Sequence, residues 1–182
     1  MEGRPALCEP AAAANAAGTL LSGARRLSRN GAPLNHLLGC SAFAEYATVS
    51  RRSLVKIDRE LPLDEAALFG CAILTGVGAV VNTAKVSAGQ SVAVIGLGGV
   101  GLAAVIGASS AGAGRIVAID LADDKLELAK RMGATDAFNA SAPDCAEQVK
   151  AATQGGVDFA FELAGSVKAM PGVISRASSA AH

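Results

Sequence analysis

The second half of the chain alternates short apolar runs with longer amphipathic ones. Short apolar runs bounded by turn residues predict strands, and runs with apolar positions three or four apart predict helices. A strict alternation of the two predicts a parallel sheet with right-handed crossovers, an α/β fold. The predicted strands are Ser91–Ile95, Arg115–Ile119, Ala137–Asn139 and Val157–Glu162; the predicted helices are Val100–Ala111, Asp123–Met132, Cys145–Thr153 and the start of one at Val167–Arg176.

The part upstream of the alternating region has a different character. A long apolar stretch predicts a helix over Ala66–Val81, begun by Pro62 and broken or bent around Gly76 and Gly78. The first 60 residues look rich in strands and loops, with Asn30-Gly31 as a turn signal. Ala11–Ala17 has helical propensity, but so short a helix is marginal by itself. The candidate strand pieces are Thr19–Leu21, Leu34–Leu38, Phe43–Val49 and Leu54–Ile57.

Composition narrows the function classes. The 182 residues are 51% hydrophobic, and 16 basic residues balance 16 acidic ones. A neutral chain without a basic run offers no electrostatic surface for nucleic acid or an anionic membrane. The start of the chain lacks the pattern of a signal peptide, and its four cysteines show no Cys-x-x-Cys spacing. We therefore expect a cytoplasmic protein with reduced thiols and no nucleic-acid or membrane partner.

One window imitates a membrane span. Val92–Ala113 contains no charged residue, and its hydropathy suits a transmembrane helix. Six glycines fall between Gly96 and Gly112, and each weakens a helix interior by about 1 kcal/mol. We therefore predict a strand, a turn and a buried helix for this window.

The turn in that window carries the strongest functional motif. Gly96-Leu97-Gly98-Gly99-Val100-Gly101 has the spacing Gly-x-Gly-x-x-Gly, directly after a predicted strand and at the start of a predicted helix. In this context the first glycine allows a tight turn, the second lets a pyrophosphate approach the backbone, and the third lets helix and strand pack closely. The helix dipole and free amides favour the phosphates.

An acidic residue follows at the expected distance. Asp120 ends the second predicted strand, 19 residues after Gly101. Its carboxylate can accept hydrogen bonds from both ribose hydroxyls and would repel a 2′-phosphate, so we predict NAD rather than NADP. Lys125 could also reach the ribose, although a solvated helix face explains it equally well.

Several segments, in order and spacing, resemble the zinc-dependent alcohol dehydrogenases of the medium-chain dehydrogenase family. They are Gly70-Cys71-Ala72-Ile73-Leu74-Thr75-Gly76, Ala84-Lys85-Val86, Gly96–Gly101, Ala118-Ile119-Asp120, Asp124-Lys125-Leu126 and Met132-Gly133-Ala134-Thr135-Asp136. The resemblance implies a partial Rossmann sheet, doubly wound, over residues 75–182. Over residues 1–74 it implies the C-terminal part of a β-rich GroES-like catalytic domain.

The family's site residues can be carried onto four positions. The resemblance implies that Cys71 is a ligand of a catalytic zinc, that Thr75 packs near the nicotinamide and that Phe43 lines the substrate pocket. It also implies that Cys8 is the last of four cysteines around a structural zinc. The implied chemistry is hydride transfer from an alcohol to NAD, with alcohols or aldehydes as substrates and a homo-oligomer as the family's state.

Other parts of the family pattern have no counterpart in this sequence. The remaining zinc ligands, the Gly-His-Glu motif, the proton-relay groups and the last sheet strands do not occur in it. We therefore expect a chain truncated at both ends that holds no zinc, is inactive alone and lacks the strand through which the family dimerises.

Three weaker candidates have plain structural explanations. His36 and Cys40 are four residues apart, but a loop histidine and a small buried cysteine explain them better than a metal site. Cys145 begins a predicted helix, where its thiolate could be stabilised, although structural filler is the simpler interpretation. Glu162 ends the fourth predicted strand, where the family often has an acid and where a solvated strand end serves equally well.

Two alternatives to an alcohol dehydrogenase stay open at this point. One is a non-catalytic product, either a residual nucleotide-binding module or a fragment that cannot fold stably. The other is a zinc-free reductase of the same superfamily, which Cys71 and Cys8 at the zinc positions argue against. Short-chain dehydrogenases are disfavoured, because the single tyrosine, Tyr46, precedes the glycine loop and is followed four residues later by Ser50 instead of lysine.

Overall fold

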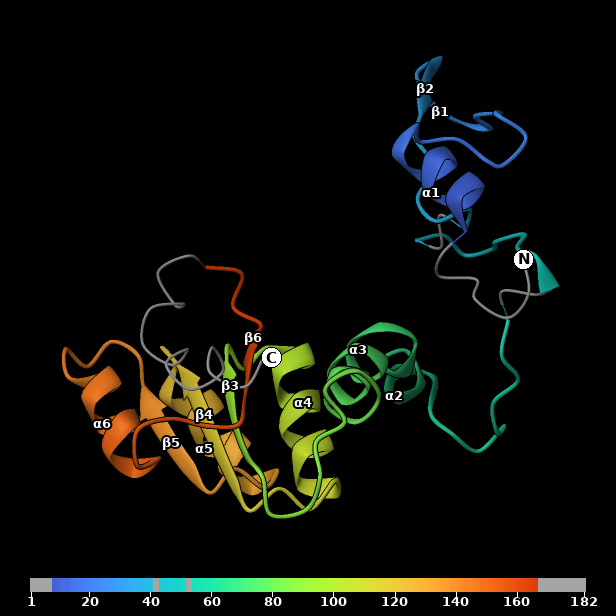
Figure 1. Cartoon of the computed structure of the whole chain (residues 1–182). Helices are drawn as coiled ribbons and strands as arrows, with labels where there is room; N and C mark the ends of the chain where they lie inside the picture. Colours follow the sequence, from blue (N-terminus) through green and yellow to red (C-terminus); the bar gives the residue numbers. More distant parts are fainter. Residues whose placement is uncertain (1–7, 41–42, 52–53, 167–182) are drawn as a thin grey trace. The chain divides into compact units, whose positions relative to one another are not determined.

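The computed structural model describes residues 8–40, 43–51 and 54–166. The chain divides into two compact units, residues 1–58 and residues 59–182 (Figure 1). The domain boundary predicted after residue 74 stays a prediction. The helix predicted at Val167–Arg176 lies outside the described residues.

In its described residues, the first unit contains one α-helix and one hairpin. Helix α1 (Glu9–Ala16) precedes β1 (Leu27–Arg29) and β2 (Ala32–Leu34), which pair antiparallel. Asn30 and Gly31 both have positive φ, 51° and 79°, as a tight hairpin turn requires, so the predicted turn is confirmed. The marginal helix forms with tertiary support, because the Asn15 side chain accepts a 2.8 Å hydrogen bond from the Leu38 amide.

Most of the strands predicted for this unit do not form, so those predictions are wrong. Leu34 alone of its segment joins a strand, and the other three candidate pieces are irregular. Phe43 and Tyr46 are almost fully exposed, so their apolar side chains find no packing partner among the described residues. An apolar run needs a neighbouring strand and a covering layer before it becomes part of a sheet.

The second unit begins with a continuous helical run, Leu63–Ala84. It consists of α2 (Leu63–Ala66), the π-helical segment η3 (Phe69–Ile73), α3 (Leu74–Gly78) and the π-helical segment η4 (Ala79–Ala84). The predicted break at Gly76 and Gly78 does not occur, since both lie in the regular α-helical part, and the alternative of a bend there stays a prediction. Gly76 instead allows close packing, because a Cβ there would overlap the Val100 carbonyl and lie 2.7 Å from the Ala103 side chain.

A four-stranded parallel sheet forms the centre of this unit, in the order β5-β4-β3-β6. The strand order reverses beside β3, as in doubly wound sheets, so the predicted fold class is confirmed. The elements predicted between Ser91 and Glu162 all form, with ends shifted by at most two residues. They are β3 (Ser91–Ile95), α4 (Gly99–Ser110), β4 (Arg115–Asp120), α5 (Asp123–Arg131), β5 (Asp136–Asn139), α6 (Cys145–Ala152) and β6 (Phe159–Glu162).

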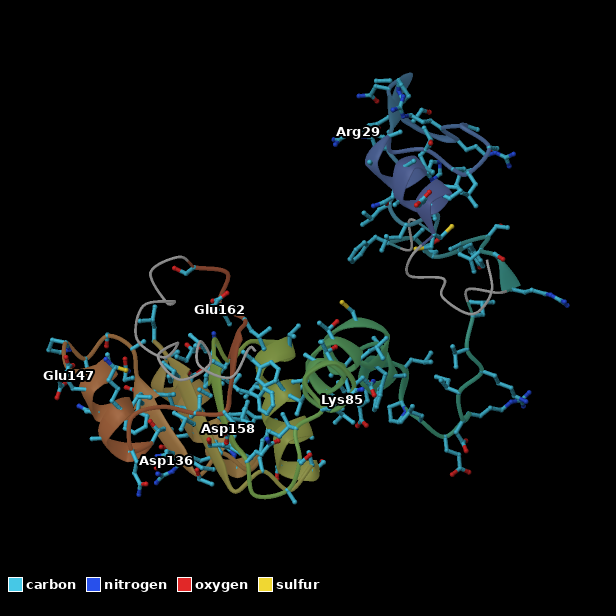
Figure 2. All side chains as sticks on the ribbon, viewed as in Figure 1. Arg29, Lys85, Asp136, Glu147, Asp158 and Glu162 are labelled. Atoms are coloured by element: carbon cyan, nitrogen blue, oxygen red, sulfur yellow. The ribbon has the colours of Figure 1, made fainter. Side chains whose placement is uncertain are left out.

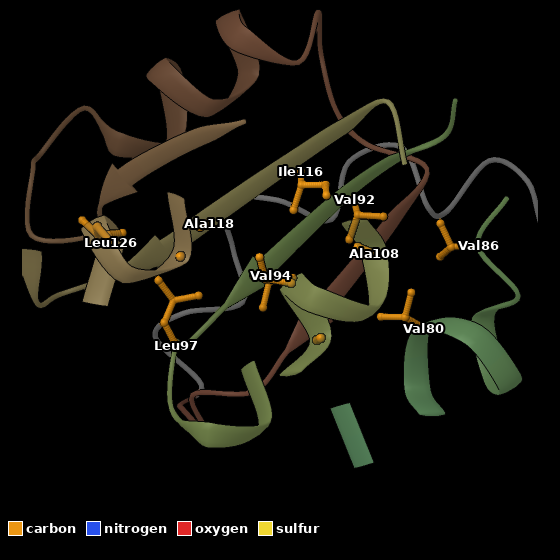
Figure 3. Packing of buried hydrophobic residues seen from close by; sticks show 12 residues of the cluster. Val80, Val86, Val92, Val94, Leu97, Ala108, Ile116, Ala118 and Leu126 are labelled. Atoms are coloured by element: carbon orange, nitrogen blue, oxygen red, sulfur yellow. The ribbon is translucent and has the colours of Figure 1, made fainter. Parts of the chain in front are cut away.

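Helices cover both faces of the sheet. Side chains of α4 and α5, with Val80 and Val86, pack on one face, around Val92, Val94 and Ile116 (Figure 3). The other face packs on Val149 of α6 and on Val157. Alternate residues of β3 and β4 are therefore buried on opposite faces, which explains why both strands are continuously apolar.

The charge-free window Val92–Ala113 forms β3, the glycine turn and α4, as predicted. Within the described residues, the run Leu63–Ala84 is long and apolar enough to cross a membrane. Length and composition alone do not distinguish a span from a core helix, and this run packs on α4 with Gly76 and Val80 buried. The expectation of no membrane partner stays a prediction.

Candidate functional site

The glycine loop joins β3 to α4 at the carboxyl edge of the sheet. Gly96 has φ of +88°, which only glycine adopts without strain, and its amide donates to the Ile119 carbonyl at 2.8 Å. A Cβ on Gly101 would overlap the Gly96 carbonyl, so the third glycine is needed for the helix to start this close to the strand. Gly98 is exposed and has nothing within 4 Å of the position its Cβ would occupy.

The open space at Gly98 lies at the N-terminus of a twelve-residue helix. Gly98 is the N-cap of α4, and the first amides of an α-helix have no partner within the helix. These amides and the helix dipole suit a diphosphate, and an absent Cβ leaves room for it. Leu97, also predicted to bind the cofactor, has a buried side chain that anchors the loop in the core.

Asp120 lies beside this loop at the end of β4. Its Oδ2 accepts a 2.7 Å hydrogen bond from the Leu97 amide and its Oδ1 a 3.0 Å hydrogen bond from the Ala122 amide. Burial alone would raise the pKa of Asp120, but those two amides and the Lys125 ammonium lower it below its ordinary value. The Lys125 side chain is half-exposed, and its Nζ is 3.9 Å from Oδ1 of Asp120. Asp120 is therefore an anion with a positive charge nearby.

A cleft of about 370 Å³ opens beside the loop and Asp120. Its volume is in the range of small-molecule sites. Parallel sheets bind ligands at this edge, beyond the carboxyl ends of strands and near the point where strand order reverses. The lining residues are Ile95, Gly96, Ile119, Asp120, Leu121, Ala140, Ala164 and Ser166.

Two residues outside the predicted site shape the walls of this cleft. Glu162 ends β6 (Figure 2), and its Oε1 accepts hydrogen bonds from the Ala164 amide at 3.0 Å and the Ser166 amide at 3.5 Å. It therefore orders the loop that lines the cleft, beyond being a solvated strand end. Asn139 ends β5 and bonds to both neighbouring turns. The sequence offers one sign that Asn139 belongs to the site, its position at the end of a predicted strand. Many polar residues share that position, so it does not single out Asn139.

The residues carried over from the family belong to both units, two to each. Thr75 is exposed on α3, next to the Gly76 that packs on α4. Cys71 is exposed on η3, within the same unit as the cleft. Phe43 and Cys8 belong to the first unit, where Phe43 is exposed and Cys8 immediately precedes α1. Their proposed roles stay predictions.

A metal centre does not assemble among the residues that the structure describes. No three His, Cys, Asp or Glu side chains in this part of the chain are placed to hold an ion. The residues present around Cys71 therefore do not fit a zinc site, and no chemical step can be derived through zinc. His36, one of the weaker candidate ligands, is buried, and its Nε2 accepts a 3.1 Å hydrogen bond from the Arg26 amide.

Cys145 does not carry a stabilised thiolate. Burial, and after it the carboxylates of Asp144 and Glu147, raise the pKa of its thiol. The packing of Cys145 beside the core on the α6 face of the sheet agrees with a structural role.

Comparison with known proteins agrees with the geometry. Residues 99–179 match the family model described as zinc-binding dehydrogenase. The chain is 48% identical over 170 residues to an S-(hydroxymethyl)glutathione dehydrogenase of Synechocystis sp., covering 92% of this chain and 46% of that protein. It is 44% identical over 177 residues to the protein of the same name from Escherichia coli O1:K1 / APEC, covering 96% and 48%.

Solved structures share the fold as well. An alcohol dehydrogenase zinc-binding domain protein from Burkholderia ambifaria superposes with a TM-score of 0.76 at 34% identity, over 92% of this chain and 49% of the other. Benzyl alcohol dehydrogenase from Acinetobacter calcoaceticus gives 0.70 at 37% identity, over 80% and 41%. The chain spans about half the length of the curated relatives it matches.

The sheet order, the glycine loop and the acid at the end of the second strand define a Rossmann-like α/β domain. Together with the family match and the relatives, these features show that the chain belongs to the zinc-binding dehydrogenase family. This family uses NAD and zinc and contains dehydrogenases acting on alcohol or aldehyde substrates.

Proposed function

We propose that this chain holds NAD(H) in the cleft beside the glycine loop, and that a protein of full family length containing it oxidises an alcohol with NAD. The observation that carries the proposal is the pairing of an open helix N-terminus at Gly98 with an anionic Asp120 at the neighbouring strand end. The first suits the pyrophosphate and the second the adenosine ribose.

Each binding role follows from a described contact. Gly98 and Gly99 are exposed residues at the start of α4, where backbone amides can donate to phosphate oxygens. Two amide donors already orient the Asp120 carboxylate, which still has acceptor capacity for the ribose hydroxyls. A 2′-phosphate would meet this negative charge, which favours NAD over NADP. The bound nicotinamide supplies the hydride acceptor.

Catalysis by the chain alone is not part of the proposal. Hydride departure from an alcohol requires its hydroxyl proton to leave, and the residues that the structure describes contain no metal-binding cluster to favour that loss. We therefore propose that the chain by itself binds the dinucleotide without turnover.

The relatives support a proposed substrate, and the composition supports a proposed compartment. The names of the relatives with 44–48% identity favour S-(hydroxymethyl)glutathione as the substrate of a full-length protein, over the aromatic alcohol named for the structure with 37% identity. Four cysteines with no paired spacing fit the reducing cytoplasm.

The test is a titration of the purified chain with NADH, comparing two glycine-to-alanine variants. In G98A the new methyl group meets no protein atom but enters the space assigned to the pyrophosphate, so we expect a folded protein with NADH affinity reduced at least about tenfold. G78A adds a methyl group on α3, in ordinary contact with Asn82, and should leave the affinity unchanged. Equal affinity in G98A and the unmutated chain would reject the glycine loop as the phosphate site.

A further inference from the structure

Asn139 links two turns that form one side of the cleft. The β4–α5 turn contributes Leu121 to the cleft wall, and the β5–α6 loop contributes Ala140. Strand pairing between β4 and β5 ends at Asp120 and Asn139. Beyond this last pair, one backbone hydrogen bond continues between the two segments, from the Ala140 amide to the Asp120 carbonyl at 2.9 Å.

The Asn139 side chain supplies the remaining connections. Its Nδ2 donates to the Leu121 carbonyl at 3.2 Å and to the Asp123 carboxylate at 2.6 Å. Its Oδ1 accepts from the amide of Ser141 at 2.9 Å and from the Ser141 hydroxyl at 2.6 Å. Two donors and two acceptor positions are all that a carboxamide has, so every one is used across these two turns.

From this geometry we propose that Asn139 is a positioning residue for the adenosine end of the bound dinucleotide. It holds Leu121 and Ala140 at the distance from one another that they have in the cleft wall. It also fixes the first turn of α5 through Asp123. The inference rests on the proposed function, because the cleft is there assigned to NAD(H). Asn139 acts through its neighbours and is not itself a lining residue.

The position of α5 matters for the charge beside the ribose. Asp123 is the first residue of α5, and Lys125 lies two residues further on, with its Nζ 3.9 Å from Asp120. The N-cap residue of this helix, Ala122, provides no side-chain cap. A helix start without a cap is free to fray, so the Asn139 bond to Asp123 is a specific restraint on it.

The experiment measures binding of two probes to the full chain by ligand-observed NMR. AMP carries the adenosine end, whereas inorganic pyrophosphate occupies the glycine loop alone. We expect N139A to raise the Kd for AMP about fivefold, as the loss of about one net hydrogen bond would, and to leave the Kd for pyrophosphate unchanged. A partly unfolded variant would weaken both probes equally.

A matched control comes from the neighbouring helix α6. The Gln148 side chain donates to the Asp144 carboxylate at 2.9 Å, also at the surface, and neither residue lines the cleft. Q148A should therefore bind both probes like the unmutated chain. A second pair of variants guards against misfolding of N139A. N139D places a carboxylate against Asp123 and should bind AMP more weakly still, and N139D/D123N, which reverses donor and acceptor across the 2.6 Å contact, should recover much of that loss.

The outcomes separate the two proposals. If the unmutated chain binds pyrophosphate and AMP but N139A leaves the AMP affinity unchanged, the positioning role is wrong and the proposed function stands. If N139A weakens both probes alike, as a partly unfolded variant would, the comparison of N139D with N139D/D123N decides the role. Failure of N139D/D123N to improve on N139D would also overturn the role. If the unmutated chain binds neither probe, the proposed function falls, and the role of Asn139 falls with it.

Discussion

The Asp120 carboxylate and the Leu97 amide are 2.7 Å apart, joining the end of β4 to the glycine loop that follows β3. The acid predicted to bind the ribose therefore also holds the phosphate loop in place before any ligand arrives. The same bond helps to keep the carboxylate ionised, because a backbone donor favours the charged form. Structural and ligand-binding effects of Asp120 must therefore be separated in any test.

Replacing Asp120 should change cofactor preference. In D120A the negative charge and the ribose acceptor are both lost, so we expect NADH to bind about tenfold more weakly or worse and NADPH to be disfavoured less than before. Affinities for both cofactors can be measured by fluorescence titration. D124A, which removes an exposed acid from the first turn of the following helix, α5, is the control and should keep the original preference. An unchanged NADH-to-NADPH ratio in D120A would remove Asp120 from the cofactor role.

The same carboxylate predicts an acid-dependent loss of stability. The pKa of Asp120 is lower in the folded protein than its ordinary value of 3.8, so the unfolded chain takes up this proton first as pH falls. Its contribution is present in full above that value and disappears as pH drops through the lowered folded value. Urea unfolding from pH 7 to pH 2.5 should show the advantage of the unmutated chain over D120N shrinking below about pH 4. A constant difference down to pH 2.5 would contradict this.

Two glycines in one helix should respond oppositely to alanine. The Gly76 position lies against Val100 and Ala103 of α4, so G76A overpacks the contact and should lower the free energy of unfolding by about 1–3 kcal/mol. G78A meets only ordinary contact and should gain up to about 1 kcal/mol from helix propensity. Chemical denaturation of both variants measures the difference. Equal effects would mean that α3 and α4 do not pack as described.

Zinc content tests the interpretation of Cys71. No metal-binding cluster occurs in the described part of the chain, so purified protein should contain far less than one zinc per molecule by elemental analysis. Dialysis against a chelator should leave the unfolding midpoint unchanged, and C71S should behave like the unmutated chain. Stoichiometric zinc that is lost in C71S would show that a ligand set forms around this cysteine.

The sequence predicted the helices and strands of the second unit better than those of the first. Buried parallel strands are short, continuously apolar and bounded by polar turns, so β3 and β4 can be recognised without knowing their neighbours. The glycine loop could also be recognised from the sequence, because a sharp turn and close helix packing each require glycine at a fixed position. In the first unit, apolar pieces such as Phe43–Val49 gave no comparable signal, since strand formation depends on partners that local pattern does not specify.

The helical run before the sheet shows a second limit. Helix propensity predicted a break or a bend around Gly76 and Gly78, yet the helix continues through these residues and is π-helical on both sides. The gain from close contact with α4 outweighs the local cost of glycine, and that contact joins residues more than twenty positions apart. Tertiary packing of this kind overrides intrinsic propensity.

The sequence by itself determined the alternation of strands and helices, the glycine loop and the acid that follows it, because each of these reflects a local requirement of backbone geometry or burial. Tertiary structure alone decided that Asp120 bonds to the Leu97 amide, that Asn139 ties two turns together and that Glu162 orders the loop over the cleft. These contacts join residues that the sheet brings to one edge. The sequence around a polar residue at a strand end does not show which group it will bond to, because that depends on the register of the neighbouring strand.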